Sequence, residues 1–245
     1  MKVAGIDIGS RFIKFVVLQG KVLIEQTRID TGYNPKEICE QLIQQAAPER
    51  YTVTGYGRQL FNDKGDASII TEIKAVALGA YHLMPTCRTI IDIGGQDTKV
   101  ITLAPSGRVS SFEMNDRCAA GTGRFLEVMA KNLGFTLDEL GALQSDNCIT
   151  INSQCTVFAE SEVISLIARG VKREEIGCAV QSLIASRVAS MAKSQNMTDT
   201  VIFTGGCAFN QYLKNRLKED TGFDLVSLPE SPLLAAYGAA LHCLQ

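Results

Sequence analysis

The feature that most constrains the fold is a strand–turn–strand pattern that the chain contains twice. The first copy runs from Val3 to Leu18 and turns at Asp7–Gly9, and the second runs from Thr89 to Ile101 and turns at Asp92–Gly94. The copies stand about 85 residues apart, and a further strand and helices follow each of them. A repeat of this size predicts an α/β protein with two similar subdomains that face each other across a cleft.

The order of apolar patterns sets the expected boundaries. Residues 1–86 are predicted to form the first subdomain and residues 87–245 the second, with the final helix free to pack back on the first. The expected strands are 3–9, 12–18, 21–28, 51–55, 89–93, 97–101, 108–113, 200–203 and one near 225, and the expected helices are 35–47, 71–83, 123–133, 157–169, 173–193, 211–219 and 233–244.

Composition excludes several classes of protein. The chain has 245 residues with 24 basic and 26 acidic side chains, so its net charge of −2 argues against a nucleic-acid partner. No run of about 18 apolar residues predicts a membrane span, and the N-terminus lacks a signal-peptide pattern. We therefore expect a cytoplasmic protein without a membrane partner, whose eight cysteines are mostly reduced.

The two Asp-Ile-Gly turns have the chemistry of a phosphate site. Asp7 and Asp92 end buried strands, where a carboxylate holds Mg²⁺ through water, and the glycines that follow let a phosphate approach the backbone. Gln96 and Asp97 stand where an attacking water is oriented, so the catalytic candidates are Asp7, Asp92 and Gln96. Candidates for contact with a nucleotide are Gly9, Ser10, Arg11, Lys14, Gly94, Gly95, Gln96, Gly121, Thr122, Gly205 and Gly206.

Alternative explanations of these turns are weaker. A single Asp-x-Gly is usually a plain hairpin turn, but two copies at strand ends and a Thr204–Gly206 segment after a third strand favour nucleotide binding. The chain contains neither a P-loop motif nor a GxGxxG that opens the first helix.

Two cysteines stand apart from the others because each precedes an expected helix. Cys118 lies in the segment Asn115–Arg124 and Cys155 in Asn152–Glu162. From spacing alone, a pair of unrelated core thiols remains an equal alternative to a ligand pair. The cysteines expected to be small buried side chains are Cys39, Cys178, Cys207 and Cys243, while Cys87 and Cys148 border strands with no chemistry around them.

Longer motifs resemble a known group. The set Asp7–Ser10, Asp92–Gly95 and Thr204–Gly206 resembles the actin, sugar-kinase and heat-shock-chaperone ATPase superfamily, with its duplicated ribonuclease-H-like fold. The match is closer to one branch, since Met114–Leu126 and Cys155–Val163 resemble the activator ATPases of 2-hydroxyacyl-CoA dehydratases and the ATPase subunits of benzoyl-CoA reductase. Segments Thr54–Arg58 and Ile91–Asp97 also match that branch.

The resemblance implies an iron–sulfur protein. In that family the cysteines corresponding to Cys118 and Cys155 bind one [4Fe–4S] cluster shared between two subunits, so a homodimer supplies four thiolates. ATP or ADP with Mg²⁺ is the second implied cofactor. The implied activity is ATP hydrolysis coupled to single-electron transfer, which activates a CoA-thioester dehydratase, and a ferredoxin or flavodoxin is the implied reductant.

Three other functions remain open from the sequence. One is the ATPase subunit of an aryl-CoA reductase. The others are a small-molecule kinase of the same fold, for which the chain is short, and a regulatory ATPase without a cluster, in which Cys118 and Cys155 have no assigned role.

Overall fold

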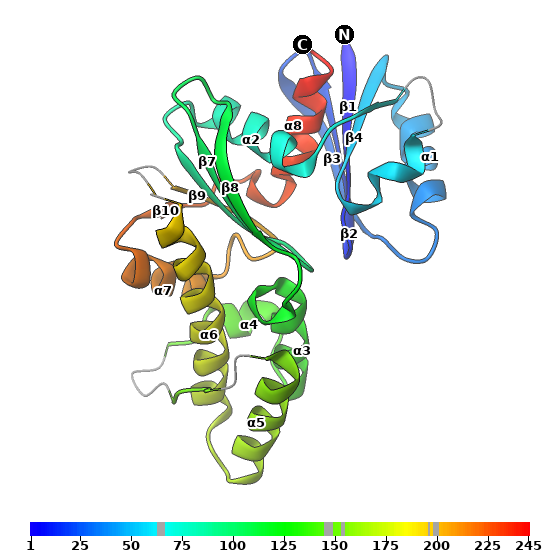
Figure 1. Ribbon diagram of the computed structural model, residues 1–245. Coiled ribbons are helices and arrows are strands. Elements are labelled where there is room, and N and C mark those ends of the chain that lie inside the picture. Colours follow the sequence, from blue (N-terminus) through cyan, green and yellow to red (C-terminus); the bar gives the residue numbers. More distant parts are fainter. Residues whose placement is uncertain (63–66, 145–148, 153–154, 196, 198–200) are drawn as a thin grey trace. The chain divides into compact units, whose positions relative to one another are not determined.

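The computed structural model describes residues 1–62, 67–144, 149–152, 155–195, 197 and 201–245. The chain forms two compact units. Unit 1 consists of Met1–Arg88, Leu103–Ser110 and Pro229–Gln245, and unit 2 consists of Thr89–Thr102 and Ser111–Leu228. Each unit is built around one five-stranded sheet with its own helices, which confirms the predicted α/β class and the duplication (Figure 1).

The sheet of unit 1 has the strand order β3-β2-β1-β4-β5. Its strands are β1 (Lys2–Ile8), β2 (Phe12–Gln19), β3 (Val22–Asp30), β4 (Arg50–Thr54) and β5 (Ala67–Ile69). The central strand β1 pairs antiparallel with β2 and parallel with β4. Both faces of β1 are buried, which explains why its sequence is almost continuously apolar rather than alternating.

Helices cover both faces of this sheet (Figure 1). Helix α1 (Pro35–Ala46) and the 3-10 helix η1 (Tyr56–Phe61) pack on the face that carries Ala4, Ile6 and Ile8 of β1. The 3-10 helix η3 (Ser231–Leu233) and helix α8 (Leu234–His242) pack on the opposite face, against Val3 of β1 and its neighbours from β2. Helix α2 (Glu72–Leu83) contacts α8.

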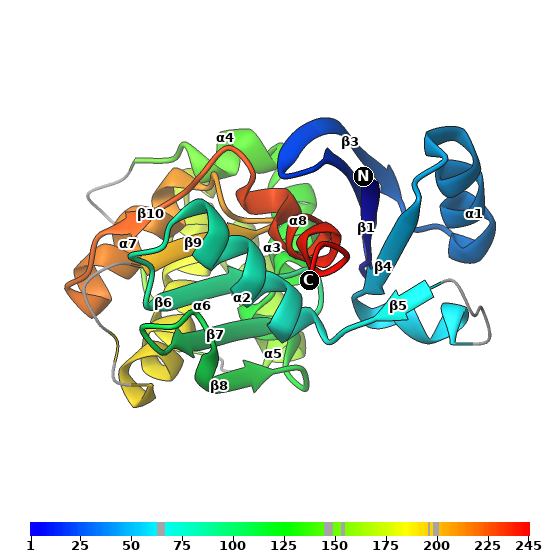
Figure 2. The ribbon, with the colours of Figure 1, turned by 90° about the horizontal axis from the view of Figure 1, so that it is seen from above.

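The sheet of unit 2 has the strand order β10-β9-β6-β7-β8, and Figure 2 shows its strands side by side. Its strands are β6 (Thr89–Ile93), β7 (Thr98–Leu103), β8 (Val109–Asn115), β9 (Val201–Gly205) and β10 (Leu225–Val226). Strand β6 pairs antiparallel with β7 and parallel with β9, the same pairing that β1 makes in unit 1.

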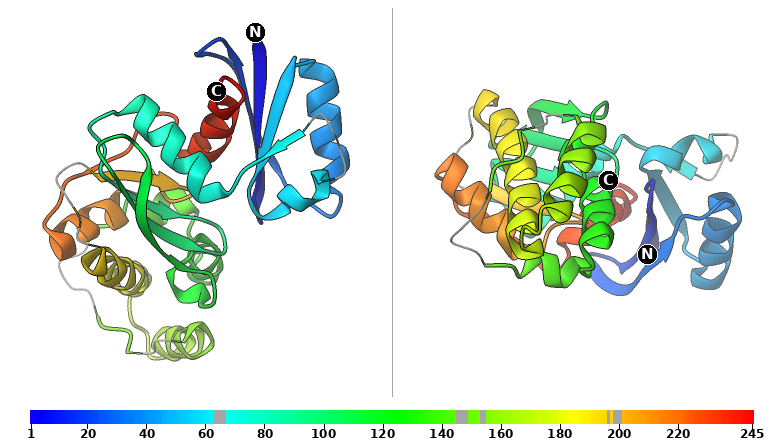
Figure 3. Two further views of the ribbon diagram at one scale, coloured as in Figure 1. Left: turned by 45° about the horizontal axis from the view of Figure 1, so that its top comes forward. Right: turned by 90° about the horizontal axis from the view of Figure 1, so that it is seen from below.

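The helices of unit 2 lie together on one face of its sheet (Figure 3). They are the 3-10 helix η2 (Ala119–Gly121), α3 (Gly123–Leu133), α4 (Leu137–Gly141), α5 (Thr156–Ala168), α6 (Arg173–Ser194) and α7 (Gln211–Thr221). The core of this unit joins Ile91, Ile93 and Phe203 of the sheet to apolar residues of α3, α5, α6 and α7. Helix α6 contacts η2, α3, α5 and α7, so it connects these helices to one another within the layer.

The elements expected from the sequence are present, and the unexpected ones are short, namely β5, α4 and the 3-10 helices η1 and η2. Strand β5 has three residues and α4 has five, so neither repeats its hydrophobic pattern long enough to stand out. Thr200, the first residue of one expected strand, and Cys148 lie outside the described residues, as do positions 153 and 154 in the segment before Cys155. Within the described ranges, no helix has both the length and the apolar composition needed to cross a bilayer.

Candidate functional site

The turn of unit 1 is organised around a buried carboxylate. Asp7 is the next-to-last residue of β1 and its side chain is 1% exposed. Lys14 lies directly opposite on β2, and its Nζ donates to Asp7 Oδ2 over 2.9 Å. The other oxygen, Asp7 Oδ1, is buried without a hydrogen-bond partner. A buried carboxylate oxygen of this kind is a suitable acceptor for a metal-bound water.

The turn of unit 2 repeats this arrangement with one more acid. Asp92 occupies the same place in β6, and its cross-strand partner is Lys99 of β7. The buried ammonium of Lys99 lies 2.8 Å from Asp97 Oδ2 and 3.9 Å from Asp92 Oδ2. Lys99 is not among the site residues predicted from the sequence. The signal was present, because Lys99 follows Asp92 at the same spacing as Lys14 follows Asp7.

A glycine at the end of the neighbouring parallel strand packs closely against each aspartate. Gly55 follows β4 with φ of 86°, and a Cβ there would lie 2.3 Å from Asp7 Oδ1. Gly205 ends β9 with φ of 88°, and a Cβ there would lie 2.4 Å from Asp92 Oδ1. Both positions therefore require glycine for conformation and for space. Gly206, the other nucleotide candidate of this segment, is exposed and has open space around its Cα.

The hairpin geometry limits which backbone amides face a ligand. The N–H of Gly9 donates to Phe12 O over 3.1 Å, and the N–H of Gly94 donates to Asp97 O over 2.9 Å. These two amides hold the turns closed, so the donors left for a phosphate are those of the residues that follow, Ser10 in the first turn and Gly95 and Gln96 in the second. The side chain of Gln96 is exposed, whereas the guanidinium of Arg11 donates to Asp30 Oδ1 over 3.0 Å.

The loop that carries Cys118 is pinned on both sides of the cysteine. Asn115 Oδ1 accepts from the N–H of Cys118 over 3.1 Å, and Asn115 Nδ2 donates to the carbonyl of Cys118 over 2.9 Å. The thiol is half-buried, and Arg187 Nη1 of α6 donates to Cys118 Sγ over 3.2 Å. Arg187 is not predicted from the sequence, because no local pattern marks an arginine 69 residues away as a partner.

Backbone hydrogen bonds join the Cys118 loop to the Asp92 turn. The N–H of Gly123 donates to Gly94 O and the N–H of Arg124 donates to Gly95 O, each over 2.9 Å. Thr98 Oγ1 donates to the carbonyl of Gly121. The first turn of α3 and the end of η2 are thus attached directly to the turn that ends β6.

Cys118 precedes a helix as expected, and that helix is the 3-10 helix η2, of which it is the N-cap residue. The cysteine does not directly precede α3, because the 3-10 helix η2 comes between them and α3 begins at Gly123. The hydroxyl of Thr122 is turned inward and donates to Ala119 O over 2.7 Å, and its residue is fully buried.

Cys155 also precedes a helix as expected. It is the N-cap residue of α5, a helix of 13 residues, and its side chain is exposed. The exposed face of α5 continues from it with large apolar side chains, namely Val157, Phe158, Ile164 and Ile167. Exposed apolar residues gathered on one helix indicate a surface that contacts another molecule.

The remaining described cysteines are core residues. Cys39, Cys87, Cys178, Cys207 and Cys243 are all buried. Burial raises the pKa of Cys39 to about 12, with smaller contributions from Glu40 and Asp7. Burial also raises the pKa of Cys207 to about 12, with Asp92 as the next cause. Cys118 and Cys155 are therefore the described thiols that a ligand reaches. Among the described residues, no group of three or more metal-binding side chains is assembled within one chain.

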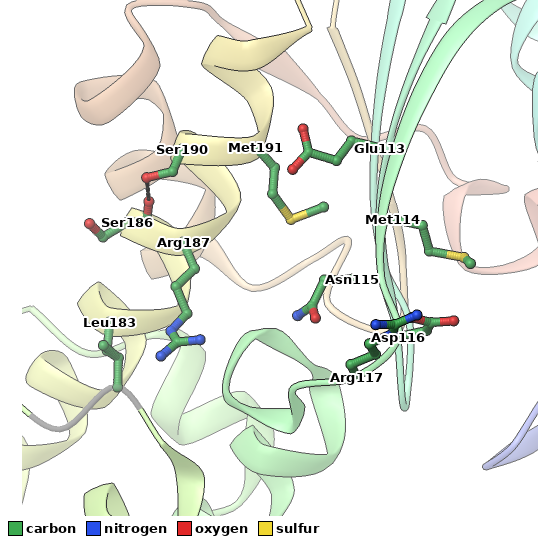
Figure 4. Close-up of a pocket in the computed structure, with 10 residues that line it drawn as sticks. All are labelled: Glu113, Met114, Asn115, Asp116, Arg117, Leu183, Ser186, Arg187, Ser190 and Met191. Atoms are coloured by element: carbon green, nitrogen blue, oxygen red, sulfur yellow. Dashed lines mark hydrogen bonds between the residues drawn. The ribbon is translucent and has the colours of Figure 1, made fainter.

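A groove of about 690 Å³ opens beside the Cys118 loop. One wall is α6 from Leu183 to Met191, and the other is the end of β8 with the loop that follows, from Glu113 to Arg117 (Figure 4). Arg187 extends from α6 into this space. The groove is lined by charges of both signs, with Glu113 and Asp116 as the acids and Arg117 and Arg187 as the bases.

Comparison with known proteins agrees with this geometry. The profile of the BadF/BadG/BcrA/BcrD ATPase family matches residues 4–243. The chain is 42% identical to an activator of lactoyl-CoA dehydratase from Anaerotignum propionicum, covering 100% of this chain and 98% of the relative. It is 39% identical to a 2-hydroxyisocaproyl-CoA dehydratase activator from Clostridioides difficile, covering 99% and 94%. One of the subunits of benzoyl-CoA reductase from Thauera aromatica is 32% identical, covering 97% and 91%.

Solved structures show the same fold. The activator of the 2-hydroxyisocaproyl-CoA dehydratase from Clostridium difficile, solved with bound ADPNP, matches with a TM-score of 0.91 and 38% identity over 99% of this chain and 94% of that one. A ROK family glucokinase from Streptomyces griseus matches with a TM-score of 0.63 at 10% identity, over 99% of each chain. The second similarity concerns the fold alone, which is that of the actin-like and sugar-kinase ATPases.

Proposed function

Because the chain belongs to the BadF/BadG/BcrA/BcrD ATPase family, we propose that it is an ATP-dependent activator of a 2-hydroxyacyl-CoA dehydratase. The names of the relatives at 42% and 39% identity support this role, and both alignments span nearly the whole of each chain. The ATPase subunit of an aryl-CoA reductase is the second candidate, supported by a relative at the lower identity of 32%.

The nucleotide part of the proposal rests on the two Asp-Ile-Gly turns. Asp7 and Asp92 hold Mg²⁺ through water, the amides of Ser10 and Gly95 face phosphate, and Gln96 orients the attacking water. The exposed amide of Gln96 and the buried unpartnered oxygen of Asp7 support these assignments. Lys14, Arg11, Gly121 and Thr122 remain candidates for contact with the nucleotide, as does the Gly205–Gly206 segment.

The two accessible thiols fit an iron–sulfur cluster shared by two copies of the chain. A [4Fe–4S] cluster takes four thiolates, and Cys118 and Cys155 are two sulfur donors per chain that are not buried in the core. We assign them as its ligands in a homodimer, an arrangement that the exposed apolar face of α5 supports. When bound, the cluster supplies one electron at low potential, which a ferredoxin or flavodoxin provides and the dehydratase accepts.

The connection between the Asp92 turn and the Cys118 loop carries the proposal. Gly94 and Gly95 accept hydrogen bonds from the first amides of α3, and η2 joins α3 to Cys118. A change in the turn when ATP is bound or hydrolysed is therefore transmitted to the cysteine through a few backbone hydrogen bonds. The nucleotide shifts the conformation by its difference in affinity for the two states.

Metal analysis tests the redox part directly. The full chain is purified under strict exclusion of oxygen beside the variants Cys118→Ala, Cys155→Ala and, as a matched control in the core of unit 1, Cys39→Ala. We expect about four iron and four sulfide per dimer in the wild type and in Cys39→Ala, and loss of both in the other two variants. An iron-free wild-type dimer that still hydrolyses ATP would contradict the redox proposal and favour a kinase or regulatory ATPase.

A further inference from the structure

Arg187 is a charged residue in contact with a proposed cluster ligand. Its Nη1 lies 3.2 Å from Cys118 Sγ, within the range of an N–H···S hydrogen bond. Two different elements supply the partners, since Arg187 belongs to α6 and Cys118 precedes η2. The contact is therefore a tertiary feature of unit 2 and not a consequence of local sequence.

The surrounding structure holds both partners of this contact in place. Ile184, Val188 and Ala189, on the inner side of α6, are buried in the core of unit 2, so the helix cannot easily rotate. On the other side, Asn115 holds the backbone of Cys118 at both its N–H and its carbonyl. Both partners are consequently held before any cluster is bound, which is the condition for a hydrogen bond with a defined electrostatic effect.

We propose that Arg187 is a positioning residue that raises the reduction potential of the cluster bound through Cys118. This inference rests on the proposed function. Reduction adds one negative charge to the iron–sulfur site, and a guanidinium bonded to a ligating sulfur stabilises the reduced state more than the oxidised state. The guanidinium remains charged at all relevant pH values, so no proton accompanies the electron at this residue.

The homodimer doubles this effect, because each copy contributes its own Cys118 and its own Arg187. The half-buried position of Arg187 weakens solvent screening of its charge. Other charged groups line the same groove, namely Glu113, Asp116 and Arg117, but no described hydrogen bond joins them to Cys118 Sγ. Arg117 therefore provides a matched control, with the same charge in the same groove and without that bond.

Redox titration of the whole protein, monitored by electron paramagnetic resonance, tests the inference. The anaerobic wild type is compared with Arg187→Gln, Arg187→Lys and Arg117→Gln after each is shown to contain iron and sulfide. We expect Arg187→Gln to retain the cluster, because arginine is not a ligand. The equilibrium constant for reduction of its cluster should fall about tenfold, which corresponds to a reduction potential about 59 mV more negative for one electron. Arg187→Lys should shift less, and Arg117→Gln should stay near the wild type.

Two results would overturn the inference while leaving the proposed function intact. They are an unchanged potential in cluster-containing Arg187→Gln, and an equal shift in Arg117→Gln, which would show that net charge alone is responsible. If Arg187→Gln does not fold, the reduction potential of Arg187→Lys is used in its place. Lysine keeps the positive charge but lacks the fork geometry of the guanidinium donor, so an unchanged potential in this variant would overturn the proposed role of the arginine hydrogen bond. A wild type without iron would instead contradict the proposed function, and this inference with it.

Discussion

The turns that follow β1 and β6 share one backbone frame and differ in charge. Each places an aspartate opposite a lysine on the adjacent antiparallel strand, and each receives a positive-φ glycine from the parallel strand on its other side. Threonine precedes that glycine in both cases, with Thr54 beside Asp7 and Thr204 beside Asp92. The common frame explains why the same three-residue motif recurs at the two strand ends.

The difference lies in the residues between the aspartate and the lysine. Unit 1 has Arg11 and Phe12 where unit 2 has Gln96 and Asp97. Asp97 takes the nearer position to Lys99, at 2.8 Å, and leaves Asp92 at 3.9 Å, whereas Lys14 is bonded to Asp7 itself. The two turns therefore share a backbone arrangement and differ in their side chains. The turn of unit 1 carries a cationic side chain, and the turn of unit 2 carries an exposed amide and an additional carboxylate.

The largest effect should come from the glycines that both turns require. We expect Gly205→Ala and Gly55→Ala each to lower the free energy of unfolding by about 3 kcal/mol, because the added Cβ overlaps an aspartate oxygen at a positive φ. Gly206→Ala is the matched control, with open space at its Cβ and an expected loss under about 1 kcal/mol. Chemical denaturation measures all three, and equal losses in Gly205→Ala and Gly206→Ala would refute this account of the frame.

Equivalent positions of the two turns should differ in catalysis. Gln96→Ala is expected to slow ATP hydrolysis about 100-fold with little change in nucleotide affinity, because the amide orients the water and does not hold the phosphates. Arg11→Ala, the variant at the equivalent position of unit 1, should slow hydrolysis less than about tenfold, since its guanidinium is engaged with Asp30. Steady-state rates and nucleotide titration separate the two effects. Similar rate losses would mean that the turns share the catalytic role.

The ion pairs should respond unequally to the loss of an aspartate. Asp7→Asn removes the carboxylate bonded to Lys14 and should lower the free energy of unfolding by about 2 kcal/mol. Asp92→Asn leaves Lys99 paired with Asp97 and should cost less than about 1 kcal/mol. Asp97→Asn serves as the control, with an expected loss near that of Asp7→Asn. Thermal unfolding of the three variants gives the ranking, and a greater loss in Asp92→Asn than in Asp7→Asn would disprove it.

A smaller, shared effect concerns alkaline pH. Cys39 in unit 1 and Cys207 in unit 2 have pKa values raised by burial to about 12 from an ordinary value near 9.0. The folded state therefore binds these protons more tightly, so the stabilisation is complete below pH 9 and is lost as the pH rises toward 12. Above pH 9, each thiol should therefore lower the free energy of unfolding by about 1.4 kcal/mol per pH unit.

Denaturation of the wild type and of the double variant Cys39→Ala, Cys207→Ala at pH 8, 9 and 10 measures this contribution. We expect the double variant to be less stable than the wild type at every pH, but its stability should fall less steeply above pH 9. Identical slopes would show that these thiols do not titrate on unfolding in this range.

The sequence predicted what is local and repeated. The strand ends at Asp7 and Asp92 were recognisable because an apolar run stops at a glycine turn, and most helices were recognisable from their spacing. Pairings between distant segments were not recognisable, and the bonds from α3 to Gly94 and Gly95 and from Arg187 to Cys118 are of this kind. The 3-10 helix η2 was also missed, because three residues cannot display a period.

The central claim is that the Asp92 turn and the Cys118 loop respond to nucleotide as one connected structure. Hydrogen–deuterium exchange of the anaerobic protein, with and without ADPNP and Mg²⁺, tests it most directly. We expect nucleotide to change the exchange of Gly123 and Arg124, whose amides bond to Gly94 and Gly95, and of residues 118–122, while α7 exchanges as before. Protection confined to residues 93–97, with 118–124 unchanged, would contradict the claim.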